Sequence, residues 1–141
     1  MKKLFFPVFI IALVLVSCKK DKKETCVTST ASITGNYKIS TARYKQSSSS
    51  SEIDYFALLD ACEKDDVFAF AANGIFNYQD AGVVCSPNGS YSGTWSLSGT
   101  TALNLDGDPA TIQSFDCSNM VVYLSDLNVS GDKLTITFVR Q

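Results

Sequence analysis

The side chains of this sequence that could carry out chemistry are carboxylates and cysteines, because the chain contains no histidine. Without histidine, the Ser–His–Asp and Cys–His arrangements that activate a nucleophile cannot form. Two acid pairs, Asp65 with Asp66 and Asp106 with Asp108, offer the two carboxylates that a glycosidase needs. Acids at strand ends and in Asp-Gly turns are more often solvated turn residues. Since no phosphate loop, HExxH motif or dinucleotide fingerprint is present either, we expect neither an enzyme nor a cofactor.

The charge of the chain argues against nucleic acid as a partner. Residues 26–141 hold six of the twelve Lys and Arg but twelve of the fourteen Asp and Glu, a net charge of −6. They lack the basic stripe that neutralises phosphates. Asp106-Gly107-Asp108 supplies oxygen ligands of the kind calcium prefers, but the rest of a calcium-loop motif is absent, so no metal is expected.

The first seventeen residues have the pattern of an export signal. A basic start at residues 1–3 precedes thirteen uncharged residues, 4–16, and then Ser17 and Cys18. Basic, apolar and small-residue regions in this order are typical of a signal peptide. The alternative, a short transmembrane anchor, is disfavoured because thirteen residues are too few to cross roughly 30 Å of hydrocarbon comfortably.

The end of this segment, Leu15-Val16-Ser17-Cys18, resembles the lipobox of bacterial lipoproteins. The resemblance implies diacylglycerol transfer to the Cys18 thiol, cleavage after Ser17 and acylation of the new N-terminus, with palmitate as the expected chain. Two or three acyl chains give a stable membrane anchor, whereas one binds only marginally. Residues 18–32 begin with a charged run that has nothing apolar to bury, so we expect a flexible tether. Lys19 resembles the outer-membrane sorting pattern, which implies a lipid-anchored protein of the cell envelope.

The cysteines that remain favour two disulfides. An even number of cysteines in a small exported domain is typical of a disulfide framework. Zinc is the competing interpretation, but the sequence has neither a CxxC spacing nor a histidine. Cys62 and Cys85 lie nearly equidistant from a predicted hairpin turn at residues 72–74, so extending the hairpin brings them together. That leaves Cys26 to pair with Cys117.

Short apolar runs separated by turn residues predict an all-β fold. The strongest signal is an Asn-Gly hairpin. Residues 52–62 have a helical apolar pattern with Ser51 as a plausible N-cap, so one short helix is expected after the first strand. About eight strands joined by short turns predict a small up-and-down antiparallel β-barrel, with a two-sheet sandwich as the alternative. The expected strands are residues 33–44, 67–71, 75–78, 91–97, 101–105, 110–115, 120–124 and 133–140.

Three stretches together resemble the lipocalin-like domain of small bacterial lipoproteins. They are residues 33–39, a version of the opening Gly-x-Trp strand with Tyr37 in place of tryptophan, residues 62–74 and residues 93–97. The resemblance covers most of residues 33–139. It implies a lipocalin-like β-barrel domain at residues 33–141, often with a cysteine pair around the central hairpin, and no common ligand.

Aromatic side chains on the predicted strands are the candidate ligand contacts. Those chosen are Phe68, Phe70, Tyr78, Trp95 and Phe138. If they line a cavity, the protein binds a small hydrophobic ligand. If they fill the core, the barrel is an interaction module that contacts an envelope protein or a glycan through its surface or loops. An internal cavity favours the first hypothesis, and a filled interior with an exposed aromatic patch favours the second.

Overall fold

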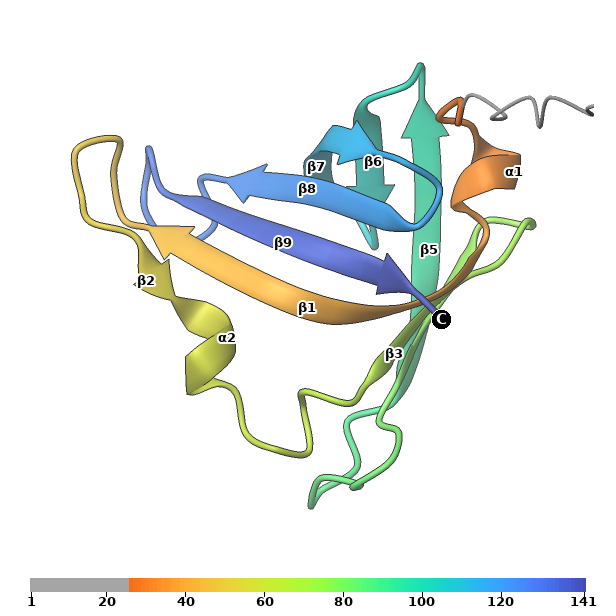
Figure 1. The fold of residues 1–141 in the computed structure, drawn as a ribbon, viewed down its shortest axis with the longest axis horizontal. Helices are drawn as coiled ribbons and strands as arrows, with labels where there is room; N and C mark the ends of the chain where they lie inside the picture. Colours follow the sequence, from red (N-terminus) through yellow and green to blue (C-terminus); the bar gives the residue numbers. More distant parts are fainter. Residues whose placement is uncertain (1–25) are drawn as a thin grey trace, which may run out of the picture.

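The computed structural model describes residues 26–141, so the expected signal peptide, Cys18 and the charged run after it lie outside the described residues (Figure 1). Nine strands and two short helices make up the described part of the chain. In order they are α1 Thr30–Ile33, β1 Gly35–Lys45, β2 Ile53–Asp54, α2 Tyr55–Leu58, β3 Val67–Phe70, β4 Ile75–Gln79, β5 Tyr91–Ser98, β6 Ala102–Leu105, β7 Asp108–Phe115, β8 Asn119–Ser125 and β9 Lys133–Arg140.

The strands form a closed antiparallel barrel. From β3 to β9 each strand pairs with the next, β1 pairs with β3, and β9 returns to pair with β1 along most of its length. The two-residue strand β2 pairs with the far end of β1 and is an appendage of this eight-stranded barrel. The predicted all-β, up-and-down barrel is therefore confirmed, and the two-sheet sandwich is not formed.

The two ends of the barrel differ in their connections. At one end lie the short turns 71–74, 99–101 and 116–118, together with α1 and the C-terminus; we call this the closed end. At the other lie the long connections 46–66, 80–90 and 126–132 and the 106–107 turn; we call this the open end. Every strand of the barrel runs from one end to the other. We call the half near the closed end the closed half and the half near the open end the open half.

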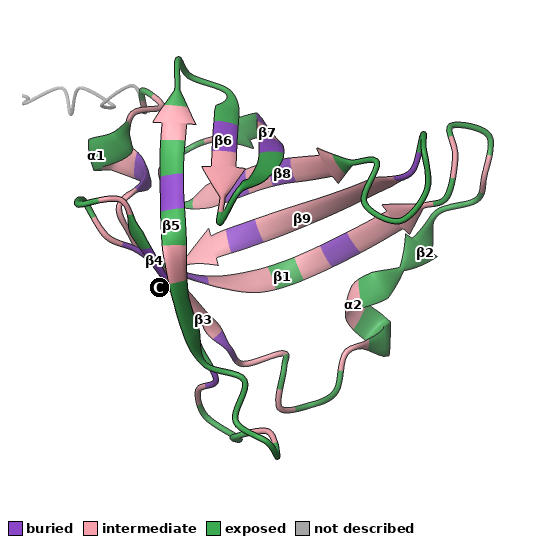
Figure 2. Ribbon diagram, turned by 180° about the vertical axis from the view of Figure 1, so that it is seen from behind, coloured by how far each residue is buried: buried purple, intermediate pink, exposed green. Residues whose placement is uncertain are grey.

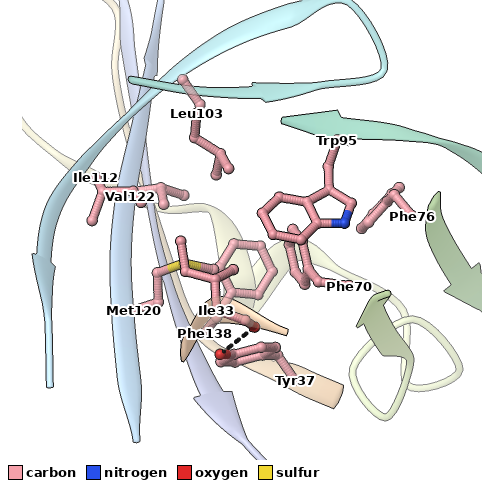
Figure 3. Packing of buried hydrophobic residues seen from close by; sticks show 11 residues of the cluster. Ile33, Tyr37, Phe70, Phe76, Trp95, Leu103, Ile112, Met120, Val122 and Phe138 are labelled. Carbon is pink, nitrogen blue, oxygen red and sulfur yellow. Dashed lines mark hydrogen bonds between the residues drawn. The ribbon is translucent and has the colours of Figure 1, made fainter. Parts of the chain in front are cut away.

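The hydrophobic core fills the closed half. Alternate residues of each strand point inward, and those nearest the short turns are buried (Figure 2). Ile33 of α1 inserts from the end and is fully buried, so the helix plugs the barrel. Figure 3 shows the core that results. Its buried members are Ile33, Tyr37, Phe70, Phe76, Trp95, Leu103, Ala110, Ile112, Met120, Val122 and Phe138.

The helix after the first strand is much shorter than the pattern predicted. It spans only Tyr55–Leu58, and its N-cap is Asp54 rather than Ser51: the Asp54 carboxylate accepts a hydrogen bond from the Ala57 N–H at 3.2 Å. β2 takes the two residues before it. Of the expected apolar face, Phe56 and Leu59 are half-buried, whereas Ile53 and Ala61 stay exposed, so little packing offsets the cost of extending the helix.

The domain begins earlier than expected, because residues 26–32 are folded and are not part of a tether. Cys26 is bonded to Cys117, and α1 starts with a capping box in which Ser29 and Ser32 each accept a hydrogen bond from the other's backbone N–H. The Ser-x-x-Ser spacing was the missed signal. No helix within residues 26–141 is long and apolar enough to cross a membrane.

Candidate ligand-binding site at the open end of the barrel

A cavity of about 310 Å³ lies inside the open half of the barrel. This volume is at the lower limit of small-molecule sites. Nine of its eleven lining residues are aliphatic or aromatic, and the other two are aspartates. The lining consists of Phe68, Phe76, Tyr91, Leu105, Asp106, Asp108, Leu124, Leu127, Leu134, Ile136 and Phe138.

The cavity exists because the same inward-facing pattern continues past the point where the core is filled. On β9, Phe138 is buried, whereas Ile136 and Leu134, two and four residues nearer the open end, are only partly buried. No helix plugs this end, and the long connections leave the inner side chains without a full set of neighbours. The period-two alternation of β9 was visible in the sequence, but it did not reveal which members would be covered.

The five candidate aromatic residues divide between the core and the cavity. Phe68 and Phe138 line the cavity. Phe70 and Trp95 lie below it as core: their rings meet edge-to-face at 5.4 Å, and the Trp95 indole N–H donates to the Ala71 carbonyl at 2.8 Å. The cavity-lining residues that were not among the candidates are Phe76, Tyr91, the five aliphatic side chains and the two aspartates.

Tyr78 does not line the cavity and supports its wall instead. Its ring packs 5.1 Å from that of Phe68, and its hydroxyl donates to the buried Asp66 carboxylate. Burial, and then the hydrogen bond and charge of Asp66, raise the pKa of Tyr78 far above its usual value. The hydroxyl therefore stays protonated and holds Asp66 in place.

The acids beside Tyr78 anchor a loop. Asp66 accepts a hydrogen bond from the Ala81 N–H at 3.1 Å, and Asp80 accepts from the Gly89 N–H at 2.9 Å. Both bonds fix the 80–90 loop, which the Cys62–Cys85 disulfide also ties to the 59–66 segment. Nowhere in the described part of the chain do three or more His, Cys, Asp or Glu side chains gather to hold a metal ion.

Exposed apolar side chains are more numerous at the open end of the barrel than at the closed end. Of the ten large hydrophobic side chains that are exposed within residues 26–141, eight lie at the open end. They are Ile53, Tyr55, Leu58, Val83, Val84, Tyr91, Leu127 and Val129. Two of them, Tyr91 and Leu127, also line the cavity.

Asp106 and Asp108 carry the polar character of the cavity. The Asp106 carboxylate accepts a hydrogen bond from the Thr94 N–H at 3.3 Å, and it lies so close to Gly93 that a Cβ there would be 2.5 Å from its oxygen. Burial, and then the negative charges of Asp106 and Asp108, raise the pKa of Tyr91. No Lys or Arg of residues 26–141 lines the cavity.

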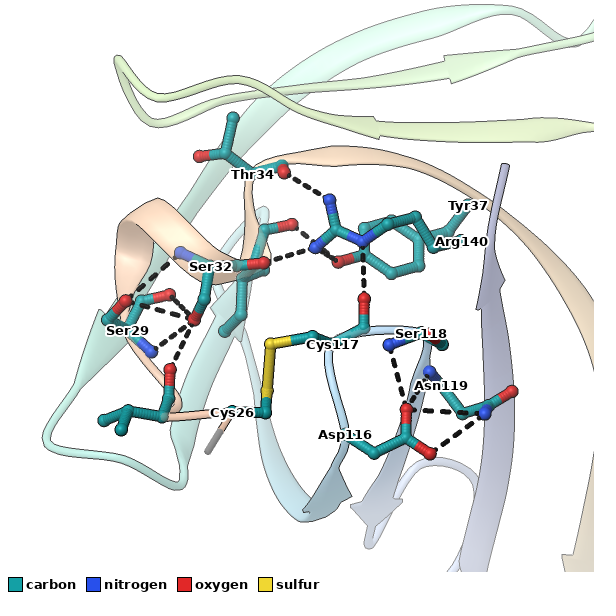
Figure 4. Close-up of a disulfide and its surroundings, with 12 residues drawn as sticks. Cys26, Ser29, Ser32, Thr34, Tyr37, Asp116, Cys117, Ser118, Asn119 and Arg140 are labelled. Carbon is teal, nitrogen blue, oxygen red and sulfur yellow. Dashed lines mark hydrogen bonds between the residues drawn. A yellow bond between two sulfur atoms is a disulfide. The ribbon is translucent and has the colours of Figure 1, made fainter. Parts of the chain in front are cut away.

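The closed end is sealed by Arg140 and a disulfide (Figure 4). The guanidinium donates to the carbonyl oxygens of Thr34 and Cys117, each at 2.8 Å, and lies 4.9 Å from the centre of the Tyr37 ring. The Cys26–Cys117 bond joins the start of the domain to the β7–β8 turn. The hydrogen bonds of Arg140 and the disulfide together hold α1 against the end of the barrel.

The barrel and its cavity agree with the comparison with known families. The family model of the lipocalin-like domain matches residues 33–136. The chain belongs to this family. Lipocalin-like barrels are typically binding domains that hold one small ligand, not enzymes. Neither the search of curated proteins nor the search of solved structures finds a match.

Proposed function

We propose that this lipocalin-like domain binds one small hydrophobic molecule in the open half of its barrel. The observation that carries the proposal is the 310 Å³ cavity with its nine apolar lining residues. Removing apolar surface from water would supply the binding energy, at about 25 cal/mol per Å². The cavity weighs against the alternative of a fully packed barrel that acts only through its surface.

The packed half of the barrel supports this role by holding the walls rigid. Phe138 belongs to both halves: it is 2% exposed, packs on Phe70 at 6.3 Å and also lines the cavity. A wall fixed by the core does not have to be ordered when the ligand enters, and this lowers the cost of binding.

We also propose that the domain is a lipoprotein, tethered to the outer membrane through lipid on Cys18. The export pattern and the lipobox-like sequence support this proposal. A tether from Cys18 would join the domain at Cys26, which the Cys117 bond fixes at the closed end. Residues 19–25 could span at most about 25 Å, so the mouth would lie on the side away from the attachment point.

Ligand binding can be tested with residues 19–141, which keep the whole barrel and both disulfides, produced in an oxidising compartment. The uncharged fluorophore N-phenyl-1-naphthylamine should bind saturably at one site. Ile136→Trp fills the cavity and should abolish this binding. The preceding residue of β9, Thr135, faces a groove on the outside of the barrel that Arg43, Lys45 and Lys133 also line, so Thr135→Trp should leave binding intact.

Two results would overturn the proposal: no saturable binding by the unmodified domain, or equal binding by both tryptophan variants. Urea unfolding of each variant shows whether it remains folded, and Leu127→Trp in the 126–132 connection provides a second cavity-filling variant. Native mass spectrometry before and after organic extraction would reveal a ligand that copurifies.

Membrane tethering is tested separately on the full chain. Cells given labelled palmitate should transfer it to the protein and leave Cys18→Ser unlabelled. The labelled protein should sediment with outer membranes. Equal labelling of both proteins, or release of the unmodified protein as a soluble species, would contradict the tether.

A further inference from the structure

Two aspartates face an otherwise apolar cavity, and nothing within the described residues neutralises them. Asp106 and Asp108 flank the turn between β6 and β7 at the mouth. The one salt bridge within residues 26–141 joins Arg43 to Asp54, on the outer side of β1 and β2. Within residues 26–141, the two carboxylates therefore lack a cationic partner.

The basic residues nearest the open end are directed elsewhere. Lys45 and Lys133 line a groove on the outside of the barrel with Arg43, and neither lines the cavity. The Lys133 ammonium also sits 3.9 Å from the centre of the Tyr123 ring. Lys64, in the 46–66 connection, donates to the Ala57 carbonyl at 3.4 Å and does not line the cavity either. Among residues 26–141, the charged side chains that line the cavity are therefore both negative.

The environment of Tyr91 indicates that this negative charge is felt inside the mouth. Tyr91 lines the cavity beside the two aspartates, and after burial their charges are the causes that raise its pKa. Partial exclusion of water strengthens an electrostatic interaction relative to the same interaction in bulk solvent. An anionic group placed here would be repelled, and a cationic one attracted.

We propose that the ligand of this cavity is a small amphiphilic amine, whose apolar part contacts Phe68, Leu134 and Ile136 while its protonated amine pairs with Asp106 and Asp108. This inference rests on the proposed function, because it names the chemical class of the molecule bound at that site. Fatty acids are excluded from this site by like-charge repulsion.

Isothermal titration calorimetry of residues 19–141 with octylamine, octan-1-ol and octanoate tests this inference. The three probes share a tail and differ only in head-group charge at pH 7. Octylamine should bind at least tenfold more tightly than octan-1-ol, and octanoate most weakly. Because screening weakens the ion pair, this ratio should fall as salt is added.

The double variant Asp106→Asn/Asp108→Asn should abolish the preference for the amine and leave binding of the alcohol unchanged. Asparagine suits position 106, whose φ is +54°, because it tolerates the left-handed region. The matched control, Glu52→Gln/Asp60→Asn, removes the same charge from the 46–66 connection without touching the cavity. It should keep the preference.

The outcomes separate this inference from the proposed function. If none of the three probes binds, both fail. If octan-1-ol or octanoate binds as tightly as octylamine, the domain binds hydrophobic ligands but the amine assignment is wrong. If the preference survives in the Asp106/Asp108 double variant, or is lost in the control, the assignment to these two carboxylates is overturned.

Discussion

The two halves of the barrel are built from the same alternating pattern but end in different structures. On β3, Phe70 is 2% exposed and packs edge-on against Tyr37 and Trp95. Phe68, two residues earlier on the same face, is half-buried and lines the cavity. The difference between the two halves does not come from the strands but from the segments that cover their ends. The closed end has short turns and a helix that inserts Ile33, whereas the open end has long connections and no plug.

Different polar side chains fix the backbone at the two ends of the barrel. At the closed end one cation, Arg140, binds several backbone carbonyl oxygens. At the open end buried carboxylates bind backbone N–H groups: Asp66 and Asp80 hold the 80–90 loop, and Asp132 holds the 126–132 loop. The closed end thereby ties the chain termini to the barrel, while the open end shapes the loops around the mouth.

The largest test of this comparison removes each disulfide in turn. On the chain-entropy model, the Cys26–Cys117 bond, with a separation of 91 residues, stabilises by about 4.5 kcal/mol and the Cys62–Cys85 bond, with a separation of 23, by about 3.5 kcal/mol. Cys26→Ser/Cys117→Ser should therefore lower the free energy of unfolding more, and Cys62→Ser/Cys85→Ser should weaken fluorophore binding more. Urea unfolding and probe titration check the two effects, and the reverse order in either measurement would contradict the division of roles.

A second test compares the two phenylalanines of β3. Phe70→Ala leaves a cavity in the packed half and should cost about 3–5 kcal/mol of stability. Phe68→Ala only enlarges a space that already exists, so we expect roughly half that cost, together with altered probe affinity. Urea unfolding and fluorophore titration of both variants provide the measurement. Equal destabilisation would mean that the open half is as tightly packed as the closed half.

The strands of the barrel could be predicted from the sequence far better than the segments at its two ends. Strand alternation and the Asn73-Gly74 turn predict the barrel and its central hairpin, because these are local signals. The two pairings expected among the cysteines are also those the structure forms. What failed were the start of the domain and the length of α2. Both depend on tertiary contacts: the Cys26–Cys117 bond and the burial of Ile33 hold one segment, whereas Ile53 and Ala61 of the expected helical face stay exposed.

The composition of the site could be predicted only in part for a related reason. Phe68 and Trp95 both occupy inward-facing strand positions in the sequence pattern, yet only Phe68 lines the cavity. Whether an inward residue is core or cavity wall depends on the loops that close the end above it, and their paths are set by long-range contacts such as that of Tyr78 with Asp66. The same limit applies to Asp106 and Asp108, which look like ordinary turn residues until the turn is placed at the mouth.

The smallest effects are expected from two carboxylates, Asp132 at the open end and Asp116 at the closed end. Asp132 is 1% exposed and accepts hydrogen bonds from the Leu127 and Asn128 N–H groups at 2.8 and 2.9 Å. Burial acts to raise the pKa of Asp132, but these bonds, with those from the Val129 N–H and the Tyr44 hydroxyl, outweigh it and lower the pKa. At the closed end, hydrogen bonds from Asn119 and Ser118 lower the pKa of the exposed Asp116.

Because both pKa values are lowered by folding, each carboxylate stabilises the domain above about pH 4, and this stabilisation is lost as the pH falls through the folded-state pKa. Asp132→Asn and Asp116→Asn should each flatten the loss of stability between pH 5 and pH 2, measured by urea unfolding. Only protonation of Asp132 should also weaken binding of the uncharged fluorophore, because it frees the connection that contributes Leu127 to the cavity wall. If the acid sensitivity of probe binding were the same in Asp132→Asn as in the unmodified domain, the loop held by Asp132 would not shape the mouth.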